Sequence, residues 1–183
     1  RSGTPSFTVT GAADTDTYTT PGTAAVASVQ LQKATGAAQT SGFADTGSAV
    51  TSATGGVYTL TPTSLSDGTY TVRALVTDLA GNQSTTSGIT VYVDTTAPTA
   101  GTLTMTTTDN GSSSSDGIIG TLTPSFSLAS PSDTGYTGAG IASVVVQVST
   151  DDGSTWTTKG TSSSTSSPYA ITLSGLTSQT TYQ

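Results

Sequence analysis

The chain has 183 residues with neither Cys nor His, and its eleven acidic residues, all Asp, outweigh four Lys and Arg to give a net charge of -7. Without imidazole or thiol groups, Ser-His-Asp and Cys-His catalysis and zinc sites built from Cys or His are excluded. The negative charge argues against nucleic acid or an anionic membrane surface as a partner. Paired Asp carboxylates leave glycoside hydrolysis open by residue type alone, but we expect no enzymatic activity.

Stretches of alternating apolar and polar residues predict short strands along the first half of the chain. These predicted strands cover residues 6–10, 27–32, 57–61, 69–77 and 88–94. Turn signals separate them, at Gly55-Gly56, Asp67-Gly68 and Ala80-Gly81-Asn82. Short strands that each have one apolar face, with no helical period anywhere, predict a two-sheet β-sandwich.

Three short segments recur in the same order in the second half, which indicates an internal duplication. Residues 4–7 match 123–126, residues 26–29 match 141–144, and residues 58–60 match 169–171. The second copy has predicted strands that begin at Pro124 and that cover 141–149 and 169–173. We therefore expect one repeat at residues 1–97 and a second at residues 98–183.

The second repeat is predicted to be incomplete at its C-terminus. The sequence stops at Tyr182-Gln183, where the counterpart of the long strand that contains Tyr70 should begin, so two strands are missing. Either the sequence is a fragment, as its start at Arg1 rather than Met also suggests, or a partner chain supplies these strands. No apolar run approaches the roughly 18 residues that cross a bilayer, so we expect no membrane insertion.

The series at residues 65–72 (LSDGTYTV), 77–82 (TDLAGN) and 91–98 (VYVDTTAP) resembles the bacterial Ig-like repeats of large secreted and cell-surface adhesins. Those adhesins are biofilm-associated or bind host cells, and many leave the cell by type I secretion. The resemblance implies an all-β fold of tandem Ig-like Greek-key β-sandwiches. It also implies a non-catalytic spacer on the bacterial cell surface whose partners are the neighbouring repeats of the same chain.

In the resembled adhesins, Asp residues in linkers and facing loops hold Ca²⁺ between consecutive domains. Such a cofactor suits a chain that has oxygen ligands but no disulfides for stiffness. The resemblance implies ligands at Asp78 and Asn82, in one tight loop, and at Asp94, where the linker begins. Pro98 then stiffens that linker. The alternative is that Asp78 and Asn82 only cap their own turn.

A second candidate calcium loop runs from Asp109 to Gly117 and resembles the opening loop of these repeats. Gly111 permits a turn, and the run of Ser brings Asp116 back toward Asp109. The alternative is a flexible Ser-rich linker.

Two aromatic residues have predicted structural roles. Tyr70 follows an Asp-Gly turn and resembles the tyrosine corner of Ig-like folds, whose hydroxyl bonds to nearby backbone. Trp156 ends a segment, 149–156, that matches the Asp box of sialidase-type propellers and predicts a tight hairpin with the Trp packed beneath it. The alternative is that Trp156 stacks on a sugar ring.

The spacer role competes with two other interpretations. The modules could bind a glycan or host surface themselves, or self-associate into a fibre through an unpaired sheet edge. They could also decorate a phage virion or a carbohydrate-active enzyme.

Overall fold

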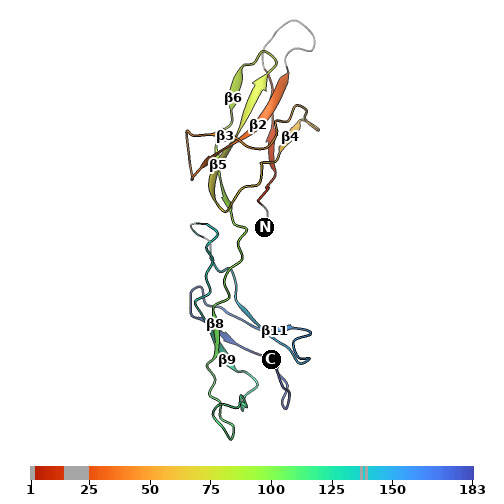
Figure 1. Cartoon of the computed structure of the whole chain (residues 1–183). Coiled ribbons are helices and arrows are strands. Elements are labelled where there is room, and N and C mark those ends of the chain that lie inside the picture. The colour runs from red at the N-terminus through yellow and green to blue at the C-terminus, as the bar shows by residue number, and fades with distance from the viewer. Residues whose placement is uncertain (1–2, 15–24, 137, 139) are drawn as a thin grey trace. The chain divides into compact units, whose positions relative to one another are not determined.

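The computed structural model describes residues 3–14, 25–136, 138 and 140–183, and every regular element in these residues is a β-strand (Figure 1). Two compact units are present. Unit 1 comprises Arg1–Thr96 together with Gly135–Ala139, and unit 2 comprises Ala97–Thr134 and Gly140–Gln183. The described residues contain no helix of the length and apolarity that crossing a membrane requires.

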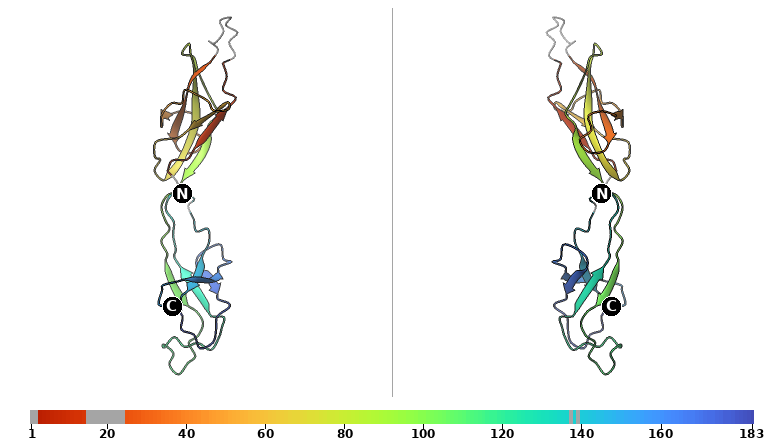
Figure 2. Two further views of the ribbon diagram at one scale, coloured as in Figure 1. Left: turned by 90° about the vertical axis from the view of Figure 1, so that its right-hand side faces the viewer. Right: turned by 90° about the vertical axis from the view of Figure 1, so that its left-hand side faces the viewer.

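Unit 1 consists of a two-stranded sheet and a five-stranded sheet, all antiparallel. Its strands are β1 (Phe7–Thr10), β2 (Val26–Thr35), β3 (Ala44–Asp45), β4 (Val57–Leu60), β5 (Gly68–Asp78), β6 (Gln83–Thr85) and β7 (Ile89–Val93). β1 pairs with β4, and the larger sheet has the order β3-β2-β5, with β6 and β7 both paired to the far edge of β5. The long strands β2 and β5 therefore form the centre of this sheet (Figure 2).

The core of unit 1 lies between these two sheets. Tyr58 and Leu60 of β4 pack from one side, and the inward side chains of β2 and β5 pack from the other; the buried cluster is Val29, Leu31, Tyr58, Leu60, Leu65, Tyr70, Val72, Ala74 and Val93. Fully burying a side chain such as Leu60 contributes about 1.5–3 kcal/mol. The two sheets thus form the β-sandwich that alternation in the sequence predicts.

Unit 2 contains a three-stranded sheet of order β12-β9-β8 and a two-stranded sheet of β10 and β11. Its strands are β8 (Thr102–Met105), β9 (Ser125–Ala129), β10 (Val145–Val148), β11 (Thr157–Thr161) and β12 (Tyr169–Thr172). The buried cluster joins one sheet to the other and comprises Val144, Val146, Val148, Tyr169, Ile171 and Leu173. Unit 2 is therefore also a two-layer all-β arrangement.

The matched segments of the two repeats pair in the same register. In unit 1, Phe7 of β1 lies opposite Leu60 of β4. In unit 2, the corresponding Phe126 of β9 lies opposite Ile171 of β12. Because corresponding residues face each other in both units, the duplication in the sequence is also a duplication of strand pairing.

Tyr70 holds the start of β5 to the turn that precedes it. Its ring is buried in the core of unit 1, and its hydroxyl donates a hydrogen bond to the carbonyl oxygen of Ser66 at 3.0 Å. Lys33, which lies on β2, places its ammonium group 5.2 Å from the centre of the ring. This is the geometry of a tyrosine corner, in which an aromatic ring fills the core while its polar end satisfies a loop carbonyl.

Replacement of Tyr70 by Phe should lower the free energy of unfolding of unit 1 by about 1 kcal/mol, since it removes one hydrogen bond and leaves the ring in place. Urea denaturation followed by circular dichroism measures the change. Tyr58→Phe is the matched control, because the Tyr58 ring is equally buried but its hydroxyl has no hydrogen-bond partner among the described residues. Equal losses in the two variants would contradict a specific role for the Tyr70 hydroxyl.

Candidate functional site

The turn between β5 and β6 contains two of the predicted calcium ligands. Asn82 donates its backbone N–H to Asp78 Oδ1 and its side-chain amide to Asp78 Oδ2, both at 2.8 Å. The Asn82 side chain is the main reason that the pKa of Asp78 lies below its ordinary value. Both carboxylate oxygens therefore accept hydrogen bonds from the turn itself, which is the turn-capping arrangement. Asp14 and Asp78 also line one shallow hollow of about 180 Å³.

Asp94 directly follows β7, and its carboxylate packs against the backbone of Gly135, which belongs to the same unit. A Cβ atom at position 135 would collide with Asp94 Oδ1, so a larger residue there would displace the Asp94 carboxylate. Oδ1 is buried and accepts no hydrogen bond from any residue that the structure describes. A buried carboxylate oxygen without a donor is energetically costly, and bound cations are one way in which proteins compensate for it.

The loop from Asp109 to Gly117 is closed by backbone donors. Gly117 donates its N–H to Asp109 Oδ2 at 2.8 Å, and Ile118 donates its N–H to Asp116 Oδ1 at 3.0 Å. Asn110 accepts a further hydrogen bond at Oδ1 from the N–H of Gly120 at 2.9 Å. The Ser run does bring residues 116–117 back to Asp109, and each of the two carboxylates is used to fix the loop.

The predicted ligands do not gather at one point. Val93, next to Asp94, pairs with Gly68 at the start of β5, whereas Asp78 is the last residue of that 11-residue strand. At about 3.3 Å per residue, the two ends of β5 are roughly 33 Å apart, which is too far for a shared ion. Within the described part of the chain, no group of three or more acidic side chains is arranged to hold a metal. Asp109 and Asp116 form a separate pair in unit 2.

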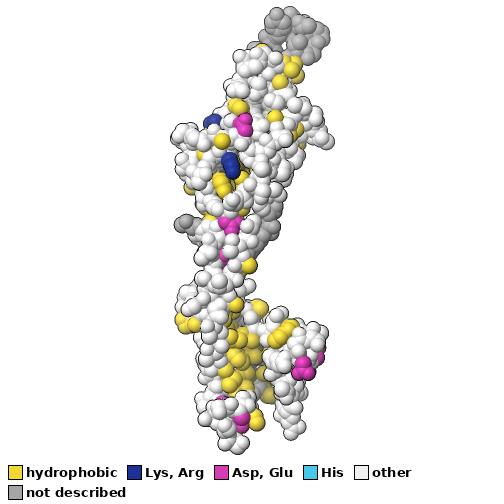
Figure 3. All heavy atoms as spheres, viewed as in Figure 1, with side chains coloured by type: hydrophobic (Ala, Val, Ile, Leu, Met, Phe, Trp, Pro, Cys, Tyr) yellow, Lys and Arg dark blue, Asp and Glu magenta, His cyan; other side chains and the backbone are white. Residues whose placement is uncertain are grey.

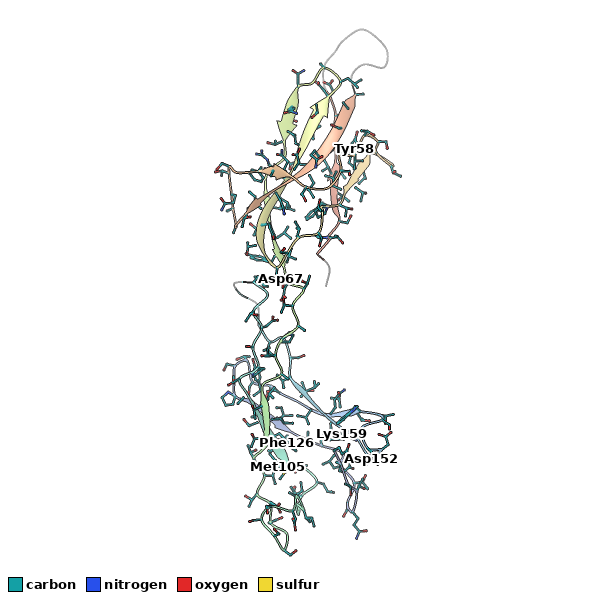
Figure 4. All side chains as sticks on the ribbon, in the orientation of Figure 1. Tyr58, Asp67, Met105, Phe126, Asp152 and Lys159 are labelled. Atoms are coloured by element: carbon teal, nitrogen blue, oxygen red, sulfur yellow. The ribbon has the colours of Figure 1, made fainter. Side chains whose placement is uncertain are left out.

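Asp67, predicted only as part of a turn, has a carboxylate that accepts four hydrogen bonds. Asp67 Oδ1 accepts the N–H and the hydroxyl of Thr95, both at 2.6 Å. Oδ2 accepts the N–H of Thr96 at 3.1 Å and also its hydroxyl. Figure 4 shows Asp67 at the end of unit 1 that is remote from β6. The carboxylate clamps the two residues that follow Asp94, and we refer to this arrangement as the Asp67 clamp.

The donors of the Asp67 clamp stabilise the ionised carboxylate. The Thr95 hydroxyl has the largest effect, followed by the Thr96 hydroxyl and the Thr95 N–H, and together they lower the pKa of Asp67 from 3.8 to about 2. The sequence contains one signal of this contact, because an Asp-Gly turn opens β5 and a Thr-Thr pair follows β7, its neighbour in the sheet. The two residues are 28 positions apart, so no local sequence pattern connects Asp67 with Thr95.

The predicted hairpin at residues 149–156 is formed between β10 and β11 and is held by Asp151. Asp151 Oδ1 accepts hydrogen bonds from the Thr155 N–H and the Ser149 hydroxyl, and Oδ2 accepts one from the Thr155 hydroxyl. The Thr155 hydroxyl is the first cause of a pKa for Asp151 of about 2. Trp156 is 50% exposed, so its indole is not part of the buried core beneath the hairpin.

The Asp67 clamp should make unit 1 sensitive to strong acid. The pKa of Asp67 in the folded chain, about 2, lies below the unfolded value of 3.8, so its stabilisation is complete above 3.8 and is lost as the pH falls through about 2. Carboxyl NMR titration should give a midpoint near 2 for Asp67, with the Thr95 and Thr96 amide signals shifting at the same pH.

The variant Thr95→Val with Thr96→Val tests the cause, because valine keeps the side-chain shape and removes the two hydroxyl donors. The pKa of Asp67 should rise toward 3.8, while the pKa of Asp151, which has its own donors, should stay near 2. A pKa for Asp67 that does not move in this variant would refute the hydroxyl contribution.

Comparison with known protein families agrees with the β-sandwich fold of unit 1. A family model described as "Bacterial Ig-like domain" matches residues 2–95, which include β1 to β7 and the Asp67 carboxylate with its first partner, Thr95. A search of curated proteins gives no match to the chain. The match covers just over half of the 183 residues and coincides with the complete sandwich of unit 1. The chain therefore belongs to the bacterial Ig-like domain family.

Proposed function

We propose that the chain is a non-catalytic spacer from an extracellular or cell-surface bacterial adhesin, which projects a distal binding domain away from the cell. The observation that carries this proposal is the repetition of one strand pairing, Phe7 with Leu60 and Phe126 with Ile171, in tandem units. Tandem repetition lengthens a structure without adding a new site. The absence of His, Cys and Glu from the sequence leaves few side chains for catalysis.

The Asp67 clamp supports the same role. A spacer must hold the segment that leaves each module, and here four hydrogen bonds fix Thr95 and Thr96 to the start of β5. Charge-assisted hydrogen bonds of this kind are roughly twice as strong as neutral ones. The exit segment is thus fixed to the body of unit 1 by side chains as well as by strand pairing.

Glycan binding is the second candidate function, and the exposed indole of Trp156 favours it. Exposed aromatic rings stack on sugar rings, and Trp156 directly follows Thr155, whose N–H is hydrogen-bonded to Asp151 in the hairpin. Assembly into a fibre and decoration of a phage virion or a carbohydrate-active enzyme are compatible with the same modules. A functional test must therefore separate projection from binding.

Residues 1–183 can be displayed on a non-adherent bacterium, with a small receptor domain of known ligand fused beyond them. Capture of ligand-coated beads should increase relative to the same receptor on a Gly/Ser linker of equal residue number, because flexible chains project less far than folded ones. Replacement of residues 1–183 by an unrelated pair of β-sandwich domains should give the same capture of beads, because projection does not depend on a particular surface.

Display of residues 1–183 without the receptor is the matched control. It should give no saturable binding on a glycan array or to host cells. Saturable glycan binding that is lost in Trp156→Ala would replace the spacer proposal with the glycan-binding one.

We also propose that calcium contributes to this role through Asp94. Among the five predicted ligands, Asp94 has a buried carboxylate oxygen that accepts no hydrogen bond within the described part of the chain. That oxygen fits a cation, whereas both oxygens of Asp78 are bonded to Asn82. A bound calcium ion would supply the missing charge compensation at the start of the linker.

Calcium should raise the melting temperature of unit 1 in scanning calorimetry of the whole chain. At a calcium concentration about 100-fold above Kd, linkage adds about 2.7 kcal/mol to the stability of the folded state. Asp94→Asn should abolish the increase and Asp78→Asn should preserve it. An unchanged melting temperature in the parent chain would end the calcium proposal and leave the spacer proposal standing.

A further inference from the structure

The loop from Asp109 to Gly117 in unit 2 contains two neighbouring residues that can react with each other. The sequence has two Asn residues, and Asn110 is followed by a glycine, Gly111. In such a pair the backbone nitrogen of the glycine can attack the side-chain carbonyl carbon of the Asn, because no Cβ atom hinders the approach. Both residues lie outside the strands and are exposed to water.

The carboxylate of Asp109 lies beside the nitrogen that would react. Asp109 Oδ1 accepts the N–H of Gly111 at 3.4 Å, and Oδ2 is held across the loop by the N–H of Gly117 at 2.8 Å. The first contact is longer than an ordinary N–H···O hydrogen bond, as catalytic hydrogen bonds often are before the reacting atoms move together. Asp109 is therefore placed to remove the proton of the Gly111 N–H.

The side-chain carbonyl of Asn110 is polarised by a second backbone donor. Gly120 donates its N–H to Asn110 Oδ1 at 2.9 Å. As the nitrogen attacks, negative charge builds up on this oxygen, and a fixed N–H donor stabilises that charge. A Cβ atom at position 120 would lie 3.2 Å from Oδ1, so the small size of Gly120 permits this close approach. Among the described residues, nothing accepts a hydrogen bond from the Asn110 amide group, so the group that would leave as ammonia is not held.

Asn82 has the opposite arrangement. It is followed by Gln83, whose side chain hinders attack by the backbone nitrogen. Its amide group donates a hydrogen bond to Asp78 Oδ2 at 2.8 Å, which holds the leaving group in place. Asn82 is therefore an internal reference for any reaction at Asn110.

We propose that Asn110 is a site of spontaneous deamidation through a cyclic imide with Gly111, and that Asp109 acts as the base. The Gly111 nitrogen forms a bond to Asn110 Cγ while its proton passes to Asp109. The Cγ–Nδ2 bond then breaks, and the leaving group takes that proton and departs as ammonia. Water opens the imide at either carbonyl, which leaves aspartate or isoaspartate at position 110. The chain and water supply every atom, and the inference does not depend on the spacer role.

Either product changes the loop. Each replaces a neutral amide by a carboxylate beside Asp109, which makes the net charge of the chain more negative by one. Figure 3 shows that unit 2 already presents acidic side chains on its surface. Isoaspartate also inserts a methylene group into the backbone, so the N–H groups of Gly117 and Gly120 should lose their partners across the loop.

The test is incubation of the whole chain at neutral pH in calcium-free, heavy-oxygen water, followed by digestion and tandem mass spectrometry. Position 110 should take up one heavy oxygen atom, and electron-transfer fragmentation should resolve both aspartate and isoaspartate there. Asn82 should remain unconverted over the same period. Asp109→Ser should slow the conversion of Asn110 roughly tenfold or more, since it removes the base.

Asp116→Ser is the matched control for a loosened loop. The Asp116 carboxylate accepts the N–H of Ile118 at 3.0 Å, so this variant removes a carboxylate and a loop contact while Asp109 stays beside Gly111. It should convert Asn110 at least as fast as the parent chain.

An Asn110 that stays intact in the parent chain would overturn the proposal. So would equal rates in the parent and in Asp109→Ser, because the pair of residues would then react without a base. Equally slow conversion in both Ser variants would assign the effect to loop closure, and aspartate without isoaspartate at position 110 would exclude the imide.

Discussion

The pairing of β2 with β5 is the constraint on which the rest of unit 1 depends. It runs from Val26 opposite Asp78 to Thr35 opposite Tyr70, and it is the longest ladder among the residues that the structure describes. Because the side-chain period of a strand is two, this register fixes which residues of both strands enter the core. The remaining strands add to the ladder or pack against its inner face: β3 continues the sheet from β2, β6 and β7 continue it from β5, and β4 supplies Leu60 to the core.

Unit 2 repeats the same plan around a shorter ladder. Its β9–β12 pair has the register of β1–β4, and its β10 corresponds to β2. At the end of β10, Ser149 and Gln183 exchange two backbone hydrogen bonds, as a pair of residues in an antiparallel sheet does. In both units the inward positions of the corresponding strand are buried, Val29 and Leu31 in unit 1 and Val144 and Val146 in unit 2.

Alternation predicted most of the strands that have an apolar face, but it missed β8, in which Leu103 and Met105 alternate with Thr, as well as β3, β6 and β11. β1, β4, β5 and β7 were found because each alternates, whereas β11 (Thr157–Thr161) contains no apolar side chain and β3 has two residues. A strand was expected over residues 141–149, but β10 comprises only Val145–Val148. A strand of this kind forms because a neighbouring strand supplies its hydrogen bonds, and the residues of that neighbour do not appear in its own local sequence pattern.

The candidate site was predicted in part for the same reason. The Asp78–Asn82 turn spans neighbouring residues, so the sequence predicted both side chains. It also predicted their two possible roles, as a turn cap or as calcium ligands. The Asp67 clamp joins a turn to a linker across 28 residues, and only the β5–β7 pairing brings the two together. The buried oxygen of Asp94 depends on Gly135, which is 41 positions further along and which no spacing rule connects to it.

The Asp67 clamp also has a mechanical consequence. The chain leaves β7 at Val93, beside the first residue of β5, so a pull on the linker directed across the strands would open the β5–β7 ladder from this end, one residue pair at a time. Peeling is the weak direction for a sheet, because the hydrogen bonds break singly rather than together. Beyond Val93, however, one carboxylate holds Thr95 and Thr96 by four hydrogen bonds that share the load. A pulling force on the linker must therefore break the four hydrogen bonds of the Asp67 clamp before it reaches the first residue pair of the β5–β7 ladder.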